Sequence, residues 1–298
     1  AVCHYPGRLG GILYGGDSRR SLMFMTTTES ERTFSQLDIA PTVARLLGIR
    51  LPLNDGRAID LVEGWGCRNA AIIIVDSLGY DLLMHLLPRL ENISRLIDDG
   101  ILIRAKAVSN HTTPAIASIL SGLVPEHHKI FDKAGAKASS ILSLPEIASA
   151  AGLRSAVIME TNGAEVYEGL IEIIHGISDR IPPEEFDREA CSMTLQSLRE
   201  GPRLLVSYFI GIDKSVHMGR EWSGIRSAVL HIDRCIGDIT EEADEKTLLI
   251  ICGDHPIHAG PLKRSSEPYY VALILGRGRS KDNKEQNIDS IGLNVASE

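Results

Sequence analysis

The segment that most constrains the fold of this chain is TLLIICGDHPIHAG, at residues 247–260. It opens with a run of apolar and β-branched residues, which is typical of a strand buried on both faces, as in a parallel sheet. The run stops at Gly253 and is followed by Asp254, His255 and His258. This cluster could bind Zn²⁺ or a similar divalent ion, or it could be a helix-capping aspartate beside two solvated histidines. The segment alone favours neither interpretation.

Predicted strands and helices alternate along the rest of the chain. Further strands are expected at residues 11–14, 70–76, 101–108, 154–160, 204–213 and 270–275. Helical spacing or helix-end signals are found at residues 38–48, 80–99, 144–151, 184–200 and 223–243, and an apolar helix is entered through Pro114. This alternation predicts an α/β fold with a doubly wound, mostly parallel sheet and helices on both faces.

Three of the predicted buried strands end in an aspartate, at Asp76, Asp213 and Asp254. In a doubly wound sheet, ligands bind beyond the carboxyl ends of the strands, so these side chains are expected at one edge. One aspartate after a strand is usually a cap. Three carboxylates accompanied by His217 and the two histidines of the first segment would repel one another unless cations lay among them. The pattern therefore favours a metal site.

Composition narrows the class of protein. The chain of 298 residues is 44% hydrophobic and 23% charged, as expected of a soluble globular protein. Its net charge of −8 argues against a nucleic-acid polymer or a membrane surface as partner, because both require a basic face. The five cysteines are odd in number and scattered without CxxC spacing, so neither a disulfide framework nor a zinc ribbon is expected. A cytoplasmic location fits these features best, and the first residues, AVCHYPGRLGG, lack the apolar core of a signal peptide.

The order of these motifs resembles the alkaline phosphatase superfamily, most closely its nucleotide pyrophosphatase/phosphodiesterase branch. The resemblance covers roughly residues 70–275. The segments that carry it are Asp76 in IIIVDSLGYD, Thr112 in NHTTPAIASILSGLVPEHHKI, Asp213 and His217 in DKSVH, Asp254 and His255 in GDH, and His258. The similarity of the TTP segment to the phosphodiesterase nucleophile segment places Thr112, rather than Thr113, at the attacking position.

The resemblance implies a two-metal hydrolase of small phosphate esters that acts through a phosphorylated Thr112. It implies one metal bound by Asp76, Thr112, Asp254 and His255, and another bound by Asp213, His217 and His258. Zn²⁺ is the expected metal, with Mn²⁺ or Mg²⁺ as alternatives. Two divalent ions about 3.5 to 4 Å apart can activate a hydroxyl and stabilise a leaving oxygen. A threonine that opens a helix also lies where backbone N–H groups favour a phosphoryl anion.

The chain departs from the family pattern in three places. The last metal-binding histidine of the family often lies far downstream, but here His258 or, alternatively, His4 must take that role. Lys133 in HKIFDK occupies the position of a phosphate-binding asparagine, and this substitution favours monoesters. Residues 38–52 resemble a segment that usually closes the family's catalytic domain, which suggests a circular permutation. Residues 1–298 are therefore expected to form a single catalytic domain, with residues 1–68 as a permuted segment that packs on the same core.

Two alternative functions remain open. A phosphomutase of the same superfamily would return the phosphoryl group to another hydroxyl, although such members usually carry a substantial inserted domain. A non-catalytic nucleotide- or metal-binding module would also fit a doubly wound sheet. His85, His175 and His231 fall within helical patterns and are interpreted as surface or core residues. The sequence does not fix the oligomeric state.

Overall fold

The computed structural model describes residues 12–14, 33–260, 262–263 and 268–279. Within them the strands form one eight-stranded sheet in the order β1-β3-β8-β7-β2-β6-β4-β5. Strands β7, β2, β6, β4 and β5 run parallel, whereas β1, β3 and β8 pair antiparallel at one side. The strands are β1 (Ile12–Tyr14), β2 (Asn69–Val75), β3 (Ile101–Lys106), β4 (Ser155–Glu160), β5 (Ile173–Ile177), β6 (Leu204–Phe209), β7 (Thr247–Gly253) and β8 (Tyr270–Arg277).

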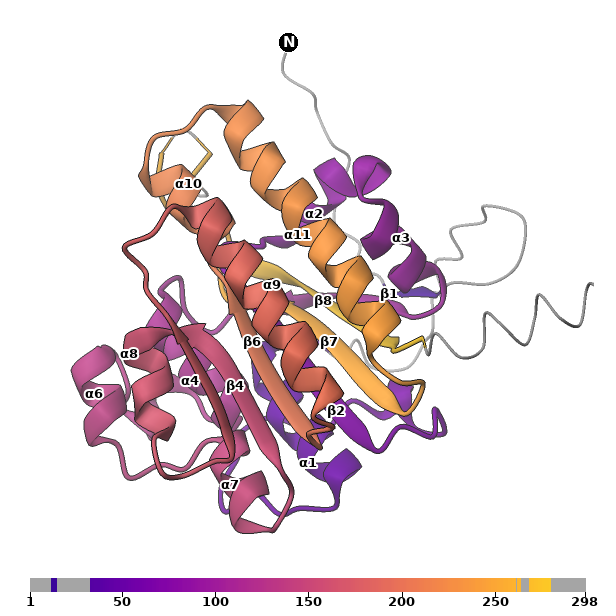
Figure 1. Ribbon diagram of the computed structural model, residues 1–298, viewed down its shortest axis with the longest axis vertical. Coiled ribbons are helices and arrows are strands. Elements are labelled where there is room, and N and C mark those ends of the chain that lie inside the picture. Colours follow the sequence, from indigo (N-terminus) through magenta and orange to yellow (C-terminus); the bar gives the residue numbers. More distant parts are fainter. Residues whose placement is uncertain (1–11, 15–32, 261, 264–267, 280–298) are drawn as a thin grey trace, which may run out of the picture.

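Helices cover both faces of the sheet (Figure 1), which confirms the predicted fold class. One layer consists of α2 (Tyr80–Leu86), α3 (Glu91–Asp98), α9 (Pro183–Arg199), α10 (Gly211–His217) and α11 (Trp222–Glu242). The opposite layer contains α1 (Ile39–Leu47), α4 (Thr112–Ser121) and α7 (Leu144–Ala150), with the short helices α5 (Pro125–His128), α6 (Lys133–Ala138) and α8 (Thr161–Ala164). The two layers explain why every residue of β6 and β7 is buried and why both strands read as continuous apolar runs.

Three local predictions differ from the structure. The predicted helix at residues 80–99 is two helices separated by a 3₁₀ turn at Leu87–Arg89, because Pro88 lacks the N–H that a continuous helix requires. The strand that was expected to end at Asp213 ends at Phe209, and Asp213 lies in the first turn of α10. His175 lies in β5, not in a helix. The short segment IIHGI has too few apolar residues to show a clear period.

The segment before β2 contributes to the core of the sheet. Helix α1 contacts β2, and its apolar residues Val43 and Leu47 are buried in the main hydrophobic cluster. The helix ends at Gly48, which adopts a left-handed conformation at the C-cap. The described part of this segment therefore shares one core with the sheet. The assignment of all 298 residues to one domain stays a prediction, because it extends to residues outside the described part.

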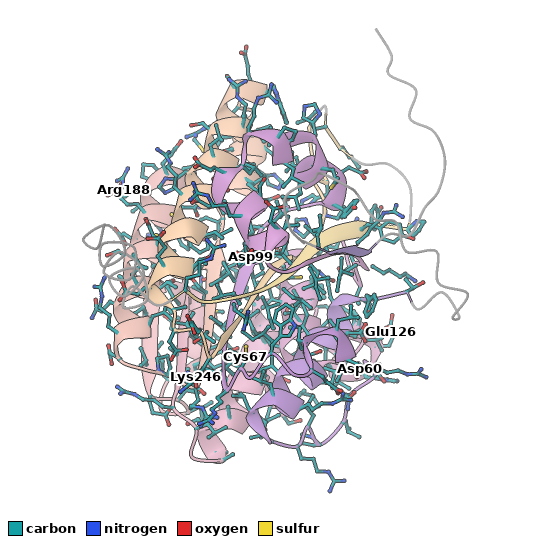
Figure 2. All side chains as sticks on the ribbon, turned by 90° about the vertical axis from the view of Figure 1, so that its right-hand side faces the viewer. Asp60, Cys67, Asp99, Glu126, Arg188 and Lys246 are labelled. Carbon is teal, nitrogen blue, oxygen red and sulfur yellow. The ribbon has the colours of Figure 1, made fainter. Side chains whose placement is uncertain are left out.

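Charged side chains of both signs, such as Asp60, Arg188 and Lys246, are exposed around the periphery of the molecule (Figure 2). The four cysteines in the described part form no disulfide. In the same residues, we find no helix with the length and apolarity needed to cross a bilayer.

Candidate metal-binding active site

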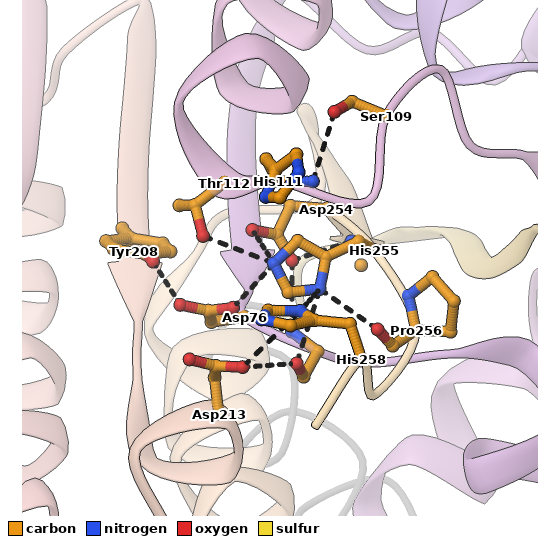
Figure 3. A network of polar contacts seen from close by, with 12 residues as sticks. Asp76, Ser109, His111, Thr112, Tyr208, Asp213, Asp254, His255, Pro256 and His258 are labelled. Carbon is orange, nitrogen blue, oxygen red and sulfur yellow. Dashed lines mark hydrogen bonds and ion pairs between the residues drawn. The ribbon is translucent and has the colours of Figure 1, made fainter. Parts of the chain in front are cut away.

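The predicted ligands meet at the carboxyl edge of the parallel strands (Figure 3). Asp76 directly follows β2, and Asp254 and His255 directly follow β7. These two strands are adjacent and in register, with Val75 opposite Gly253. Because the two parallel strands end at the same level, the three side chains that follow them lie close together.

The loop that follows β2 packs closely against the end of β7 and the loop that follows it. The backbone passes so close at Gly253 that a Cβ atom there would lie 2.1 Å from the Leu78 carbonyl oxygen. Ser77 adopts a left-handed conformation with φ of 64°, which is unfavourable for a residue with a side chain. Its N–H donates to Asp254 Oδ1 at 3.0 Å, and its hydroxyl donates to Asp213 Oδ1 at 2.8 Å. Ser77 thus joins the ends of β2 and β7 to helix α10. No pattern in the sequence pointed to this residue.

The ring of His255 has a defined orientation. Its Nδ1 lies 3.0 Å from the Pro256 carbonyl oxygen, which can only accept a hydrogen bond, so Nδ1 carries the proton. In the neutral ring, Nε2 then presents its lone pair to Asp76 Oδ1 at 3.4 Å and to Asp254 Oδ2 at 3.5 Å. A second hydrogen-bond partner that fixes the tautomer in this way is typical of metal-binding histidines.

The two carboxylate oxygens opposite His255 lack hydrogen-bond partners. Asp76 Oδ1 and Asp254 Oδ2 are both buried and accept no hydrogen bond from any described residue. A buried carboxylate oxygen without a hydrogen-bond donor is costly. A cation between these three atoms would remove that cost. The donor set therefore fits a divalent metal ion.

Thr112 lies against the same atoms. Its Oγ1 is 3.2 Å from His255 Nε2, within hydrogen-bond distance. Thr112 is the first residue of α4, and His111 is its N-cap. The preceding loop is fixed by a 3.0 Å bond from His111 N–H to Ser109 Oγ. The predicted nucleophile thus stands beside the buried carboxylates at the positive end of a helix.

A second group of ligands is more exposed. His217 Nε2 lies 3.3 Å from His258 Nε2 and 3.3 Å from Asp213 Oδ2. Asp213 Oδ1 lies 4.0 Å from His258 Nδ1. These three residues form one potential metal-binding group, and Asp213 forms another with Asp76 and His255. Asp213 therefore lies between the two predicted metal positions, whereas the resemblance assigned it to only one of them.

Burial and like charge dominate the electrostatics. Burial raises the pKa of Asp76 well above its usual value, and the charges of Asp254 and Asp213 raise it further, against a hydrogen bond from Tyr208. Burial also raises the pKa of Asp254, which His255 opposes. The Tyr208 hydroxyl donates to Asp76 Oδ2, and burial followed by the Asp76 charge raises the pKa of Tyr208. The cluster is thus unfavourable as a set of bare anions, as expected of a cation site.

Helix α10, which carries Asp213 and His217, is held by a buried carboxylate from α9. Asp187 Oδ1 accepts from Ile210 N–H at 2.9 Å, and Asp187 Oδ2 accepts from Gly211 N–H at 3.1 Å. A Cβ atom at Gly211 would lie 2.1 Å from Asp187 Oδ2, so a larger residue there would displace this carboxylate. Burial raises the pKa of Asp187 to about 7.

Other predicted residues lie apart from this cluster or outside the described part. Lys133 Nζ forms an ion pair with Glu160 Oε1 at 3.2 Å, at the end of β4, and its side chain is half exposed. His4 lies outside the described residues, so its candidacy as a ligand stays a prediction.

Tyr208, like Ser77, was not identified from the sequence. A tyrosine near the end of an otherwise apolar buried strand was the available signal.

Solved structures show what the fold resembles. Phosphonoacetate hydrolase from Sinorhizobium meliloti 1021, solved with phosphonoformate, has a TM-score of 0.53 at 14% identity, over 63% of this chain and 56% of that one. A putative sulfatase from Bacteroides thetaiotaomicron has a TM-score of 0.52 at 12% identity, over 70% and 64%. An alkaline phosphatase superfamily protein from Vibrio parahaemolyticus has a TM-score of 0.51 at 14% identity, over 71% and 61%. The chain thus spans less than two thirds of each of these proteins, and the similarity shows an alkaline phosphatase-like fold.

Sequence comparison gives the family. No curated protein sequence matches the chain significantly. The family model described as type I phosphodiesterase / nucleotide pyrophosphatase matches residues 70–135 and 148–292, which is more than half of the chain. These ranges contain the sheet edge with all three aspartates and Thr112. The chain therefore belongs to the type I phosphodiesterase / nucleotide pyrophosphatase family.

Proposed function

We propose that the chain is a two-metal hydrolase of phosphate esters in which Thr112 carries the phosphoryl group transiently. One observation carries the proposal: His255 Nε2 and two buried carboxylate oxygens without hydrogen-bond partners converge beside the Thr112 hydroxyl. Membership of the family supports the class of reaction. The donor set supports metal dependence, because these oxygens have no hydrogen-bond donor among the described residues.

The residues that would hold the metals are those of the two groups. Asp213 lies within reach of both positions. The first metal would be held by Asp76, Thr112, Asp254 and His255, and the second by Asp213, His217 and His258. Mixed oxygen and nitrogen donors suit Zn²⁺, with Mn²⁺ or Mg²⁺ as alternatives.

When bound, the metals would supply positive charge that favours the ionised threonine and stabilises the leaving oxygen. Thr112 Oγ gives its proton to solvent and forms a bond to phosphorus as the bond from phosphorus to the leaving oxygen breaks, and the leaving oxygen takes up a proton. Water then attacks phosphorus and gives up a proton, the bond to Thr112 Oγ breaks, and Thr112 Oγ takes up a proton. The first turn of α4 presents free N–H groups and its dipole to the phosphoryl oxygens throughout.

The fold between the nucleophile and Asp213 supports a hydrolase over a phosphomutase. Strands β4, β5 and β6 all follow Thr112, and all belong to the common sheet. The described residues of this stretch therefore form part of the core, and they include no block that resembles the inserted domain usual in phosphomutases. A non-catalytic module would have no need of a threonine hydroxyl aimed at the buried ligands.

The substrates that we propose are small phosphate esters. The family description favours diesters and pyrophosphates. Lys133 would add a cation for monoesters, but Glu160 compensates part of its charge. We expect neither a nucleic-acid polymer nor a membrane as partner, and a cytoplasmic location, in agreement with the acidic composition and scattered cysteines.

A pair of adjacent variants tests the proposal. Thr112→Ala is expected to reduce hydrolysis of a chromogenic diester and monoester by at least about a thousandfold in the metal-loaded protein, because the nucleophile is lost. Thr113→Ala, the matched control in the same helical turn, is expected to keep most of the activity. Brief reaction with the monoester, followed by acid quench and mass spectrometry, should show one added phosphoryl group on the peptide that contains Thr112. Full activity of Thr112→Ala would overturn the proposal.

A further inference from the structure

Gln36 is a fully buried side chain that lies outside the range matched by the family. It belongs to a 3₁₀ turn at Gln36–Asp38, immediately before α1. Its exposed fraction is 0%, although glutamine usually lies at the surface. A buried polar side chain must satisfy its hydrogen bonds, so its partners show what it does.

Its partners lie on the two loops that form the candidate site. Gln36 Nε2 donates to the carbonyl oxygens of Gly253 at 2.7 Å and of Asp254 at 2.6 Å. Gln36 Oε1 accepts from Val108 N–H at 2.9 Å, four residues before Thr112. One side chain therefore joins the loop that carries three of the predicted metal ligands to the loop that leads to the nucleophile.

The backbone around Gln36 is held independently. The carbonyl oxygen of Phe34 accepts from Lys106 N–H at 2.8 Å, at the end of β3. Asp38 accepts from Ser35 N–H at 3.0 Å and from Arg57 N–H at 2.8 Å. The carboxamide is therefore presented from a fixed support, and its three bonds fix the position of the loops relative to that support.

Only a primary amide of this length satisfies all three groups. The two hydrogens on Nε2 are directed at two carbonyl oxygens, while Oε1 receives the N–H of Val108. Glutamate keeps the acceptor but has no donor when ionised, and methionine keeps the length but makes none of the bonds. A buried backbone group left without a partner destabilises the loop to which it belongs.

We infer that Gln36 is a positioning residue for the catalytic centre, which holds the Thr112 hydroxyl at its contact with His255. The inference rests on the proposed function. Thr112 Oγ1 and His255 Nε2 are 3.2 Å apart and belong to loops that Gln36 bridges. A displacement of about 1 Å in such a contact can lower a rate about a hundredfold. The segment before β2 would then be part of the active site and not only of the core.

A control residue separates positioning from stability. Thr42 is 3% exposed, and its hydroxyl donates to the Asp38 carbonyl oxygen and accepts from Ile59 N–H at 2.8 Å. It supports the same segment but makes no contact with either site loop. Thr42→Val thus removes buried hydrogen bonds from the support of Gln36 without removing the bridge.

The experiment compares Gln36→Met with Thr42→Val in full-length, metal-loaded protein. Gln36→Met is expected to lower kcat for a chromogenic phosphodiester about 10- to 100-fold with KM changed less than about threefold. It should also change the visible absorption of the Co²⁺-loaded protein and weaken Co²⁺ binding about tenfold, as loss of an outer-shell partner does. Thr42→Val should lower Tm but leave kcat and the Co²⁺ spectrum close to those of the parent.

The outcomes distinguish a failure of the inference about Gln36 from a failure of the proposed function. If Gln36→Met and Thr42→Val lose Tm alike, and kcat and the Co²⁺ spectrum are unchanged in both, Gln36 is structural only and the inference is wrong. If Thr112→Ala remains fully active, the proposed function fails instead. Should Gln36→Met not fold, Gln36→Glu takes its place with the same expectations, because it keeps the shape and the bond from Val108.

Discussion

The two halves of the candidate centre differ in their access to water. In the buried half, the side chains of Asp254 and His255 have 0% exposure, whereas in the other half His217 is 51% and His258 is 23% exposed. Water can hydrate the exposed ligands when no metal is bound, but it cannot reach the unpaired oxygens of the buried half. We therefore expect the proposed metal in the buried half to be the more tightly held, and the one in the exposed half to be lost at lower cost.

The largest expected effect follows from neutralising a buried ligand. Asp76→Asn should lower kcat/KM by more than about a hundredfold, since loss of outer-shell partners alone costs about 10- to 100-fold in metal affinity. Without metal the variant should unfold at the same or a higher temperature than the parent, because it no longer buries a carboxylate beside Asp254 and Asp213. Differential scanning calorimetry with and without Zn²⁺ measures both effects.

Asp233→Asn is the matched control for this experiment. Asp233 is also a buried aspartate, but its Oδ1 accepts from Ile93 N–H at 2.8 Å, between α11 and α3. Its replacement should lower Tm and preserve the rise in Tm on addition of Zn²⁺. An undiminished Zn²⁺-induced rise in the Asp76→Asn variant would remove Asp76 from the centre.

The second prediction concerns the exposed half. His258→Ala should abolish or strongly weaken the binding of one metal, by about 10- to 100-fold or more, while the metal in the buried half is retained. His4→Ala should leave both metals bound. Isothermal titration of the metal-free variants with Zn²⁺ gives the stoichiometry. A loss of one site in His4→Ala, with two sites in His258→Ala, would transfer the ligand role to the N-terminal segment.

The sequence predicted most of the sheet and the buried half of the centre because both depend on local patterns. Strands β2 and β7 are uninterrupted apolar runs, and their terminal residues Asp76, Asp254 and His255 meet wherever the strands pair in parallel. The apolar run and the polar residues that follow it can each be recognised within one short segment of the sequence. Thr112 was identified by the resemblance of its segment, and the structure brings it to the same edge.

The supporting residues could not be predicted in the same way because their partners are far apart in sequence. Gln36 binds residues more than 200 positions away in the sequence. No sequence pattern marks Asp187 as buried, yet its carboxylate accepts hydrogen bonds from the backbone at the start of α10. Ser77 follows Asp76 directly, but its conformation and its bond to Asp213 exist only after three strands have assembled.

The third prediction concerns Asp187, which holds the helix that carries Asp213 and His217. Burial raises the pKa of Asp187 from 3.8 to about 7, so between these values the folded protein holds a proton that the unfolded chain releases. Stability from this group is therefore present at low pH and is lost as pH rises toward 7, by up to about 1.4 kcal/mol per pH unit. Asp187→Asn keeps an acceptor for Ile210 N–H and should flatten this dependence. Thermal unfolding of the two metal-free proteins from pH 4 to pH 8 measures the difference, and identical profiles would contradict it.

The smallest expected effect concerns Lys133, which lies beyond both halves. If its charge favours a monoester, Lys133→Asn should lower kcat/KM for a phosphomonoester a few-fold more than for a diester with the same leaving group, because a monoester carries more phosphoryl charge. Lys137→Asn is the control, since Lys137 lies in the same helix and pairs with Glu165. Equal losses for the two substrates would assign Lys133 to the ion pair with Glu160 alone.

The most direct test of the central claim is the number and location of bound metals. Anomalous scattering from crystals soaked in Zn²⁺ should show two peaks, one among Asp76, Thr112, Asp254 and His255 and the other among Asp213, His217 and His258. Brief treatment of the crystals with a chelator should remove the peak in the exposed half first. A single peak elsewhere, or no peak at saturating Zn²⁺, would contradict the account.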